Sequence, residues 1–278
     1  MSSTLSSSTT SSESQVGPAW RGASYPVQVW VLTGRSLRAL LRDPRLVIFN
    51  LLHPLIMLLV FSQVFGKAML SAVAEQGGNY VNYLMPAILV TTGIGAALES
   101  GVGLITDMKN GVIARFRALP IHPSSVLVAR SLSDLVRTAA QLTIVVVVAA
   151  LLFDFSPAGG ASGVTAALLL SLLVSWSLTW VFLAMAAWLR SEEVMNSVGF
   201  LAMFPLMFAS NAFVPIESLP GWLQAVAKVN PLTYTVDAAR GLSLALPMEN
   251  GPTAAVVVST LLGALSVQLA VRGFRRPT

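Results

Sequence analysis

The sequence contains no cysteine and only two histidines, His53 and His122. A disulfide framework, a thiolate zinc site and a thiol nucleophile are therefore excluded. It also lacks the G-x-x-x-x-G-K-[ST] loop that cradles phosphate in many ATPases. Charged residues make up only 10% of the chain, whereas soluble domains carry about 25%. These absences argue against a metalloenzyme, an ATP-hydrolysing chain and a soluble protein.

Apolar residues are abundant instead: they make up 55% of the chain, and the mean hydropathy is +0.74. Most of the apolar segments approach the roughly 20 residues needed to cross the hydrocarbon core of a bilayer. We predict an all-α integral membrane protein with six transmembrane helices. The third segment is short, so we expect its helix to begin earlier, near Ser133. The segments are Leu46–Phe65, Leu84–Thr106, Thr138–Phe153, Val164–Leu189, Val194–Val214 and Thr253–Val271.

The basic residues are distributed unevenly between the two sides of this arrangement. Of the 17 lysines and arginines, only Lys67, Lys228 and Arg240 fall in the first, third and fifth loops. The others lie in the termini and in the second and fourth loops, and basic residues accumulate on the cytoplasmic side. Both termini are therefore predicted to be cytoplasmic, with an even number of crossings. The net charge of +5 is then a topology signal and not a nucleic-acid surface.

The two ends of the chain are predicted to be cytoplasmic. Residues 1–24 begin with a Ser/Thr-rich stretch that lacks the basic start and apolar core of a secretory signal. We expect a disordered tail there, and a second cytoplasmic tail over residues 273–278. Residues 25–45 predict an amphipathic helix that Pro44 ends. It suits the membrane interface, although a cytoplasmic extension with snorkelling arginines fits nearly as well. Its arginines are Arg35, Arg38, Arg42 and Arg45.

The second loop, residues 107–137, is the longest on the cytoplasmic side. It contains an apolar stripe at helical spacing, which ends at Pro120 and Pro123. A short amphipathic helix of this kind can lie on the membrane or fit a groove on a partner, and the residues alone favour neither. The stripe is Val112, Ile113, Phe116 and Leu119, flanked by Lys109, Arg115 and Arg117.

Glu99 lies inside the second apolar segment. A carboxylate at that depth costs roughly 3 kcal/mol on insertion scales. It is a candidate gate, substrate contact or proton site, and a structural hydrogen bond to a neighbouring helix explains it equally well. Glycines in the same segment permit close helix approach. They are Gly93, Gly95, Gly101 and Gly103.

Residues 211–241, between the last two apolar segments, are too polar to span a bilayer and too apolar for a soluble loop. Trp222 and Tyr234 suit a membrane interface, and Asp237 and Arg240 are spaced to pair on a helix. We predict a broken helical hairpin that dips into the outer membrane face, with its irregular backbone buried in protein or facing a wet cavity. Prolines that interrupt helices stand at Pro215, Pro220 and Pro231.

The order of motifs in this hairpin resembles the membrane subunit of ABC-2 type exporters, in the branch that contains the daunorubicin-resistance permeases. The shared pattern is N-x-F-x-P, L-P-x-W-L, N-P-L-T-Y and D-x-x-R-G. The resemblance extends more loosely from about residue 25 to the C-terminus. The motif positions are Asn211, Phe213, Pro215, Leu219, Pro220, Trp222, Leu223, Asn230, Pro231, Leu232, Thr233, Tyr234, Asp237, Arg240 and Gly241.

The resemblance implies a type V exporter architecture, with a transmembrane domain over residues 46–272 and a connecting helix over 25–45. A coupling helix over Gly111–Leu119 would dock in an ATPase subunit, with Phe116 as its apolar anchor. The coupling residues would be Gly111, Val112, Arg115, Phe116, Arg117 and Leu119. The translocation or gate candidates would be Glu99, Asn211, Phe213 and Pro215. The hairpin residues would be Pro220, Trp222, Asn230, Pro231, Tyr234, Asp237 and Arg240.

The resemblance also implies partners. Two copies of a cytoplasmic ABC ATPase would bind ATP and Mg, and this chain would bind no cofactor. A second copy or a related permease would complete the translocation path in a bacterial plasma membrane. Hydrophobic drug-like or lipid substrates would move out of the cytoplasm or the inner leaflet.

Two other classes remain open from the residues alone. An ion-coupled secondary transporter or channel would need a coupling-ion site, for which Glu99 with His53 is the candidate. No repeat between the two halves of the chain supports an inverted-repeat transporter. An intramembrane enzyme would need polar residues clustered within the spans, and the sequence offers no such cluster.

Overall fold

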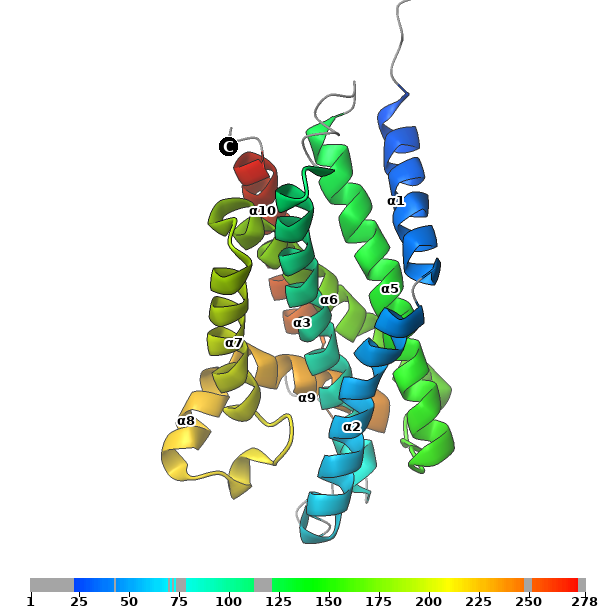
Figure 1. Cartoon of the computed structure of the whole chain (residues 1–278). Coiled ribbons are helices and arrows are strands. Elements are labelled where there is room, and N and C mark those ends of the chain that lie inside the picture. The colour runs from blue at the N-terminus through cyan, green and yellow to red at the C-terminus, as the bar shows by residue number, and fades with distance from the viewer. Residues whose placement is uncertain are drawn as a thin grey trace, which may run out of the picture.

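The computed structural model describes residues 23–42, 44–69, 71, 73, 79–112, 122–247 and 252–274, without the side chains of 39–42, 44–47 and 123. All regular elements among these residues are helices (Figure 1). Five are long and apolar enough to cross a membrane, which confirms an all-helical membrane fold. These are α2 (Pro44–Met69), α3 (Tyr80–Lys109), α5 (Pro123–Leu152), α6 (Gly160–Leu189) and α10 (Thr253–Phe274). The others are α1 (Tyr25–Arg42), α7 (Glu192–Phe208), α8 (Gly221–Val229), α9 (Pro231–Leu244) and the 3-10 turn η2 (Ile216–Ser218).

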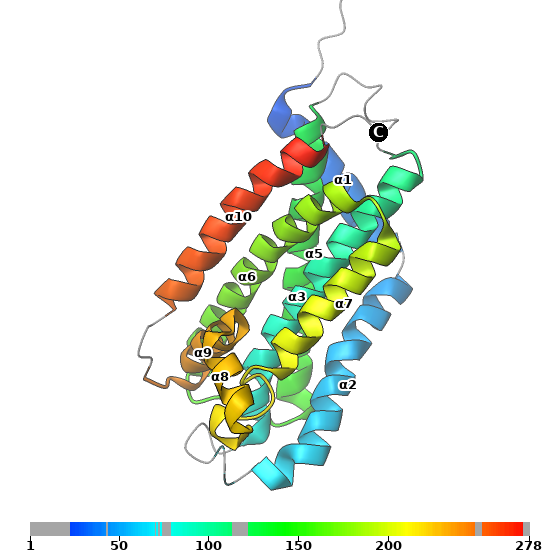
Figure 2. The same cartoon turned by 90° about the vertical axis from the view of Figure 1, so that its left-hand side faces the viewer.

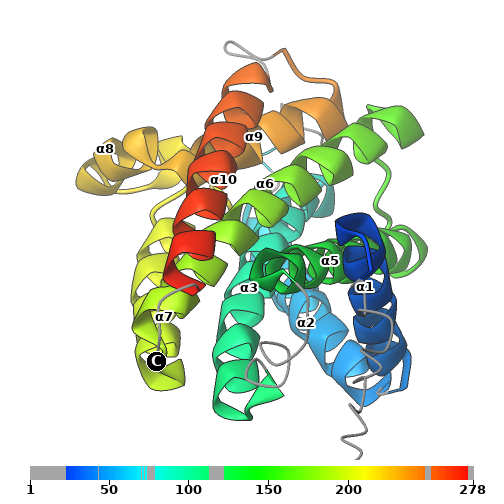
Figure 3. The same cartoon turned by 90° about the horizontal axis from the view of Figure 1, so that it is seen from above.

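Helices α3 and α6 form the centre of the bundle (Figure 3). Each has 30 residues and is therefore about 45 Å long. More than half of the apolar stretch of each is buried inside the chain. Helix α10 packs on α6, whereas α2, α5 and α7 pack on α3. Both central helices are therefore longer than the roughly 30 Å hydrocarbon core of a bilayer.

The two ends of the bundle differ. The start of α1 and the finish of α10 lie together at one end, which we call the terminal end (Figures 1 and 2). Helices α8 and α9 lie at the opposite end, the hairpin end. Helix α9 packs across α6 and α3. Helix α8 stands at the periphery (Figure 3), where Trp222 and Val229 are 72% and 77% exposed.

Helix α1 runs beside the first half of α5 (Figure 1). Polar groups join the two: the Thr33 hydroxyl donates to the Ala129 carbonyl at 3.3 Å. The Gln28 side-chain oxygen accepts from the backbone N–H of His122 at 3.1 Å. The same helix leaves Trp30 76% exposed. The polar side of α1 thus faces the protein, and the Trp30 ring points away from it.

Small residues let the central helices approach closely. The Ser175 hydroxyl donates to the Gly93 carbonyl at 2.8 Å, and a Cβ on Gly93 would lie 2.9 Å from that of Ser175. A Cβ on Gly101 would lie 2.9 Å from the carbonyl oxygen of Phe182. The expected close approach is therefore found at these two glycines. It is not found at Gly95, where a Cβ would meet nothing within 4 Å.

Helix boundaries differ from the predicted segments at two places. Helix occupies both ends of the predicted 107–137 loop, because α3 continues to Lys109 and α5 begins at Pro123. Arg130 and Arg137, which the sequence analysis placed in this loop, lie inside α5 and face acidic partners on α3. The fifth apolar segment was expected to continue to Val214, but α7 stops at Phe208. Its last carbonyl groups accept hydrogen bonds from the side chains of Ser210 and Asn230, which follow in the sequence.

The breaks in the hairpin stand where proline predicted them. Pro215 and Pro220 immediately precede η2 and α8, and Pro231 is the first residue of α9. Proline is favoured at the first position of a helix because it has no N–H to leave unpaired. The three prolines therefore divide the hairpin into its short elements.

Gly163 tests the contact between α6 and α9. A Cβ on this glycine would lie 2.4 Å from the backbone oxygen of Leu242, so Gly163→Ala must displace α9. We expect it to lower the free energy of unfolding by about 1–3 kcal/mol and to lower the thermal midpoint in detergent. Gly95→Ala is the matched control, because it adds a good helix former in open space. Equal midpoints for the two variants would contradict the close contact.

Candidate functional site

Arg240 of α9 is the centre of a polar cluster at the hairpin end, where it is only 3% exposed. Its Nε donates to the Tyr83 carbonyl at 3.2 Å and its Nη2 to the Asn211 carbonyl at 3.0 Å. Its Nη1 pairs with Asp237 at 3.2 Å, and the guanidinium lies 3.7 Å from the centre of the Tyr83 ring. A buried charge must be paired and hydrogen-bonded. This arginine therefore fixes α9 to α3 and to the segment that follows α7.

Side chains of α3 and α9 hold the irregular segment that follows α7. Tyr83 donates its hydroxyl to the Asn211 carbonyl at 3.0 Å, and Tyr80 donates to the Phe213 carbonyl at 2.8 Å. The Asn211 amide donates to the Asp237 carboxylate. Partial burial raises the pKa of Asp237, although half of this side chain is exposed, and Arg240 and Asn211 act in the opposite direction. Non-helical backbone among apolar helices needs such partners.

Asn230 joins the end of α7 to the start of α9. Its amide nitrogen donates to the carbonyls of Leu206 and Ala209, each at 2.7 Å. Its side-chain oxygen accepts from the N–H of Leu232 at 2.9 Å, which caps α9. The last carbonyls of a helix have no partner within it, so Asn230 and the Ser210 hydroxyl, which donates to Met207, explain why α7 stops here.

Phe213 ties the same segment to α2. Its side chain is 6% exposed, and its ring stacks on that of Phe61 with centres 4.4 Å apart. Phe208 approaches it from α7 at 5.7 Å. Asn211, Phe213, Asn230, Pro231, Asp237 and Arg240 are therefore brought together or lie in contact with the cluster. Trp222 and Tyr234 are not: both are exposed, and the Tyr234 hydroxyl donates to the Lys228 carbonyl at 2.6 Å.

Glu99 belongs to a second cluster, which links α2, α3 and α5. Its carboxylate pairs with Arg137 at 3.4 Å and accepts from the Asn50 amide at 3.2 Å. Arg137 also pairs with Asp134 at 3.7 Å. The Gln141 side-chain amide donates to the Asn50 carbonyl at 3.0 Å. Glu99 is thus not isolated, and its contacts match the structural hydrogen bond that the sequence left as one alternative.

This charged cluster continues toward the terminal end. Arg130 forms an ion pair with Asp107 and donates to the Ser100 carbonyl at 3.2 Å. Ser100 in turn donates to Asp134. These residues were not predicted as part of a site, although Arg130, Asp134 and Arg137 recur at the spacing of one helix face. Within the described part of the chain, no group of His, Asp and Glu side chains is arranged to hold a metal ion.

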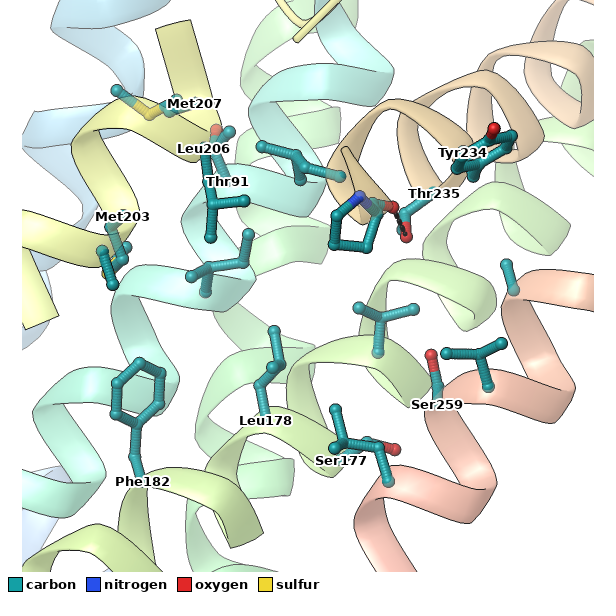
Figure 4. A pocket seen from close by; sticks show the side chains of 18 of the residues that line it. Thr91, Ser177, Leu178, Phe182, Met203, Leu206, Met207, Tyr234, Thr235 and Ser259 are labelled. Carbon is teal, nitrogen blue, oxygen red and sulfur yellow. Dashed lines mark hydrogen bonds between the residues drawn. The ribbon is translucent and has the colours of Figure 1, made fainter. Parts of the chain in front are cut away.

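An apolar cavity of about 420 Å³ lies between α3, α6, α7, α9 and α10 (Figure 4). Phe182 and Leu178 of α6 and Met203 of α7 line its deeper part, and Thr235 of α9 lies at the other end. Ligand pockets usually measure 300–1,000 Å³, so this volume suits a small ligand. No sequence pattern indicates this cavity, because its walls come from five separate helices.

The proposed coupling residues are only partly described. Gly111 adopts a left-handed conformation with a φ of +69°. Its N–H bonds to the Met108 carbonyl at 3.3 Å, as glycine commonly does just after a helix. Val112 follows this turn. The remaining coupling candidates lie outside the described residues; they are Arg115, Phe116, Arg117 and Leu119.

Arg240→Lys tests whether the guanidinium fork secures the hairpin. Lysine keeps the charge but cannot reach the Tyr83 and Asn211 carbonyls and the Asp237 carboxylate together. We expect a loss of about 2–4 kcal/mol in unfolding free energy, since each hydrogen bond to a charged group contributes about 1.5–3 kcal/mol. Arg272→Lys, at an exposed position of α10, should leave the thermal midpoint unchanged. A similar small effect in both variants would contradict the role of Arg240.

A double-mutant cycle tests the pairing of Glu99 with Arg137. Arg137→Gln leaves the Glu99 carboxylate without its cation and should lower the thermal midpoint, whereas Asp134 keeps Arg130. Glu99→Gln in the same chain removes the unpaired carboxylate and should recover part of the loss, with a coupling of about 0.5–3 kcal/mol. Additive effects of the two substitutions on thermal unfolding would mean that the contact contributes nothing to folding.

Comparison with known proteins agrees with this arrangement. A family model described as ABC-2 type transporter matches residues 27–244, from α1 to the end of α9. The daunorubicin resistance ABC transporter permease protein DrrB1 of Streptomyces coeruleorubidus is 32% identical over 208 residues, 75% of this chain and 72% of that protein. The probable doxorubicin resistance ABC transporter permease protein DrrC of Mycobacterium tuberculosis is 25% identical over 276 residues, 96% of this chain and 98% of that protein.

Another relative is the putative transport permease ycf38 of Cyanophora paradoxa. It is 29% identical over 216 residues, 77% of this chain and 73% of that protein. The family match covers both polar clusters and most of the cavity walls. The chain therefore belongs to the ABC-2 type transporter family.

Proposed function

We propose that this chain is the membrane subunit of an ATP-driven exporter in a bacterial plasma membrane. One observation carries the proposal: the ABC-2 family match extends over residues 27–244 of a chain that has no phosphate-binding loop. The energy must then come from a separate subunit. Two copies of a cytoplasmic ABC ATPase bind ATP and Mg, and a second copy of this chain or a related permease completes the path.

We propose six membrane spans, with α7 as the fifth. Helix α7 has 17 residues, the lower limit of the length that crosses a bilayer. The start of α1 and the finish of α10 lie at one end of the bundle (Figure 1), which supports an even number of crossings. The concentration of basic residues in the termini supports a cytoplasmic location of the terminal end. The hairpin end is then extracytoplasmic, and α8 and α9 form a hairpin at the outer membrane face.

Apolar substrates are favoured by the cavity and by the relatives. The lining of the cavity contains no charged side chain among the described residues. Two relatives are called daunorubicin and doxorubicin resistance permeases. A hydrophobic drug-like or lipid substrate therefore fits this chain, and it moves out of the cytoplasm or the inner leaflet.

The mechanism that we propose uses α3 and α5 as one unit. The coupling segment Gly111–Leu119 connects their ends, so closure of the ATPase pushes both helices. Glu99 and Arg137, with the neighbouring ion pairs, prevent the two helices from sliding past each other. At the other end of α3, the backbone of Tyr83 contacts Arg240. A displacement of α3 is thereby transmitted to the hairpin, past which the substrate leaves.

Co-purification with the ABC ATPase encoded beside this chain tests the proposal. Phe116→Asp should abolish capture in detergent, because it places a charge on the apolar anchor of the coupling segment. Lys228→Asp, which adds the same side chain at an exposed position of the hairpin end, should leave capture intact. Capture by both variants would move the docking surface elsewhere, for example to α1. Failure of the folded wild-type chain to capture the ATPase would reject the exporter assignment.

A further inference from the structure

The apolar cavity between α6, α7 and α10 is open toward the side of the bundle. On α7, Leu206 is 39% exposed, and on α10, Val258 and Leu262 are 59% and 40% exposed. These three side chains line the cavity and also face outward. Helix α9 lies near the lower ends of α7 and α10 (Figure 2), and closes one end of the cavity through Pro231 and Thr235. A ligand therefore reaches this cavity from beside the helices.

The cavity is elongated along the bundle. Its lining extends on α6 from Val174 to Phe182 and on α10 from Ala254 to Leu262. Eight residues of a helix correspond to about 12 Å. The volume of about 420 Å³ is nearly three times that of an engineered cavity of ~150 Å³ that binds benzene. A flexible chain of well over ten carbon atoms fits such a space better than a compact ring.

Most hydroxyl groups of the lining already donate to the protein backbone. Four of the five hydroxyl-bearing side chains around the cavity donate to backbone carbonyls nearby. These are Thr91 to Ala87, Ser177 to Leu173, Tyr234 to Lys228 and Thr235 to Pro231. A polar or charged ligand would lose its water here and find at most one unused hydroxyl donor, that of Ser259, which is unfavourable. A saturated hydrocarbon chain has no hydrogen bonds to water to lose, and it gains apolar contacts in the cavity.

We propose that this cavity binds the acyl tail of a phospholipid-like amphiphile, whose polar head remains outside at the α9 rim. The bilayer supplies such tails at the lateral opening. The head then lies beside the exposed Tyr234 and the segment that contains Lys228, to whose carbonyl Tyr234 is bonded. This inference rests on the proposed exporter function and narrows its substrate class to molecules with a flexible aliphatic chain.

Photolabelling tests the site. The purified chain, in nanodiscs, is irradiated with a phosphatidylglycerol that carries a diazirine near the end of one acyl chain, and labelled peptides are mapped. We expect label on the α6 segment that contains Leu178 and Phe182, in addition to the outward face of α2. Ala202→Trp fills the cavity from α7 and should reduce the α6 label roughly tenfold, a loss of about 1.4 kcal/mol in binding. The α2 label serves as the internal standard.

Matched variants keep the experiment decisive. Leu201→Trp adds the same ring one position away, at a side chain that is 75% exposed and outside the lining, and should retain the α6 label. Ala254→Phe repeats the filling from α10, with Val257→Phe, 54% exposed and outside the lining, as its control. Equal labelling in filled and control variants of similar thermal stability would overturn the proposal, as would an unlabelled α6 in the wild type.

The competitor identifies the ligand class. Daunorubicin, a ring system with a charged amine, should not displace the acyl label from α6, and displacement would assign the cavity to drugs instead of lipid tails. The outcome is independent of ATPase capture. Specific labelling without capture would leave a lipid site in a chain that is not an exporter subunit. Capture without labelling would keep the exporter and reject the site.

Discussion

A buried arginine in so apolar a chain must find all its hydrogen-bond partners within the protein, and the arrangement of the hairpin end follows from that requirement. Arg240 reaches the backbone of α3, the carboxylate of Asp237 on its own helix and the Asn211 carbonyl in the segment after α7. Together these contacts restrict the backbone conformation between α7 and α9. The residues that carry the family resemblance are therefore largely those that organise this backbone. Their side chains are occupied with one another and leave little to offer a substrate.

The charged side chains around Glu99 must also find partners within the protein, and there they join two long helices. The acids of α3 and the arginines of α5 neutralise each other in pairs, which lets two long helices stay together where apolar packing alone would permit sliding. Glu99 retains half of its side-chain surface exposed, although Asn50 of α2 donates to its carboxylate. The two polar clusters thus occupy different parts of α3. Between them, its contacts with α6 rely on small residues such as Gly93 and Ser175.

The sequence predicted those features that depend on local chemistry. Proline marked the breaks of the hairpin, because its missing N–H acts at its own position, and long apolar runs marked the spans. It did not predict where α7 ends, since Asn230, which binds the last carbonyls of α7, lies some twenty residues further along the chain. Arg137 was assigned to the second loop because it precedes the third apolar segment, and its pairing with Glu99 appears only when two helices meet. The cavity depends on the packing of five helices and has no local signature at all.

The attachments of α7 differ in strength at its two ends. At the hairpin end the buried Asn230 holds it through two short hydrogen bonds. At the terminal end an exposed ion pair, Lys109 with Glu192 at 3.3 Å, ties it to α3, and exposed pairs of this kind contribute little and weaken as salt increases. Between them, only the ridge that includes Met195 and Gly199 rests on the bundle. Helix α7 is therefore held by polar bonds at its hairpin end and mainly by the buried Met195 near its terminal end, and any tilt between these two attachments changes the width of the cavity that it walls.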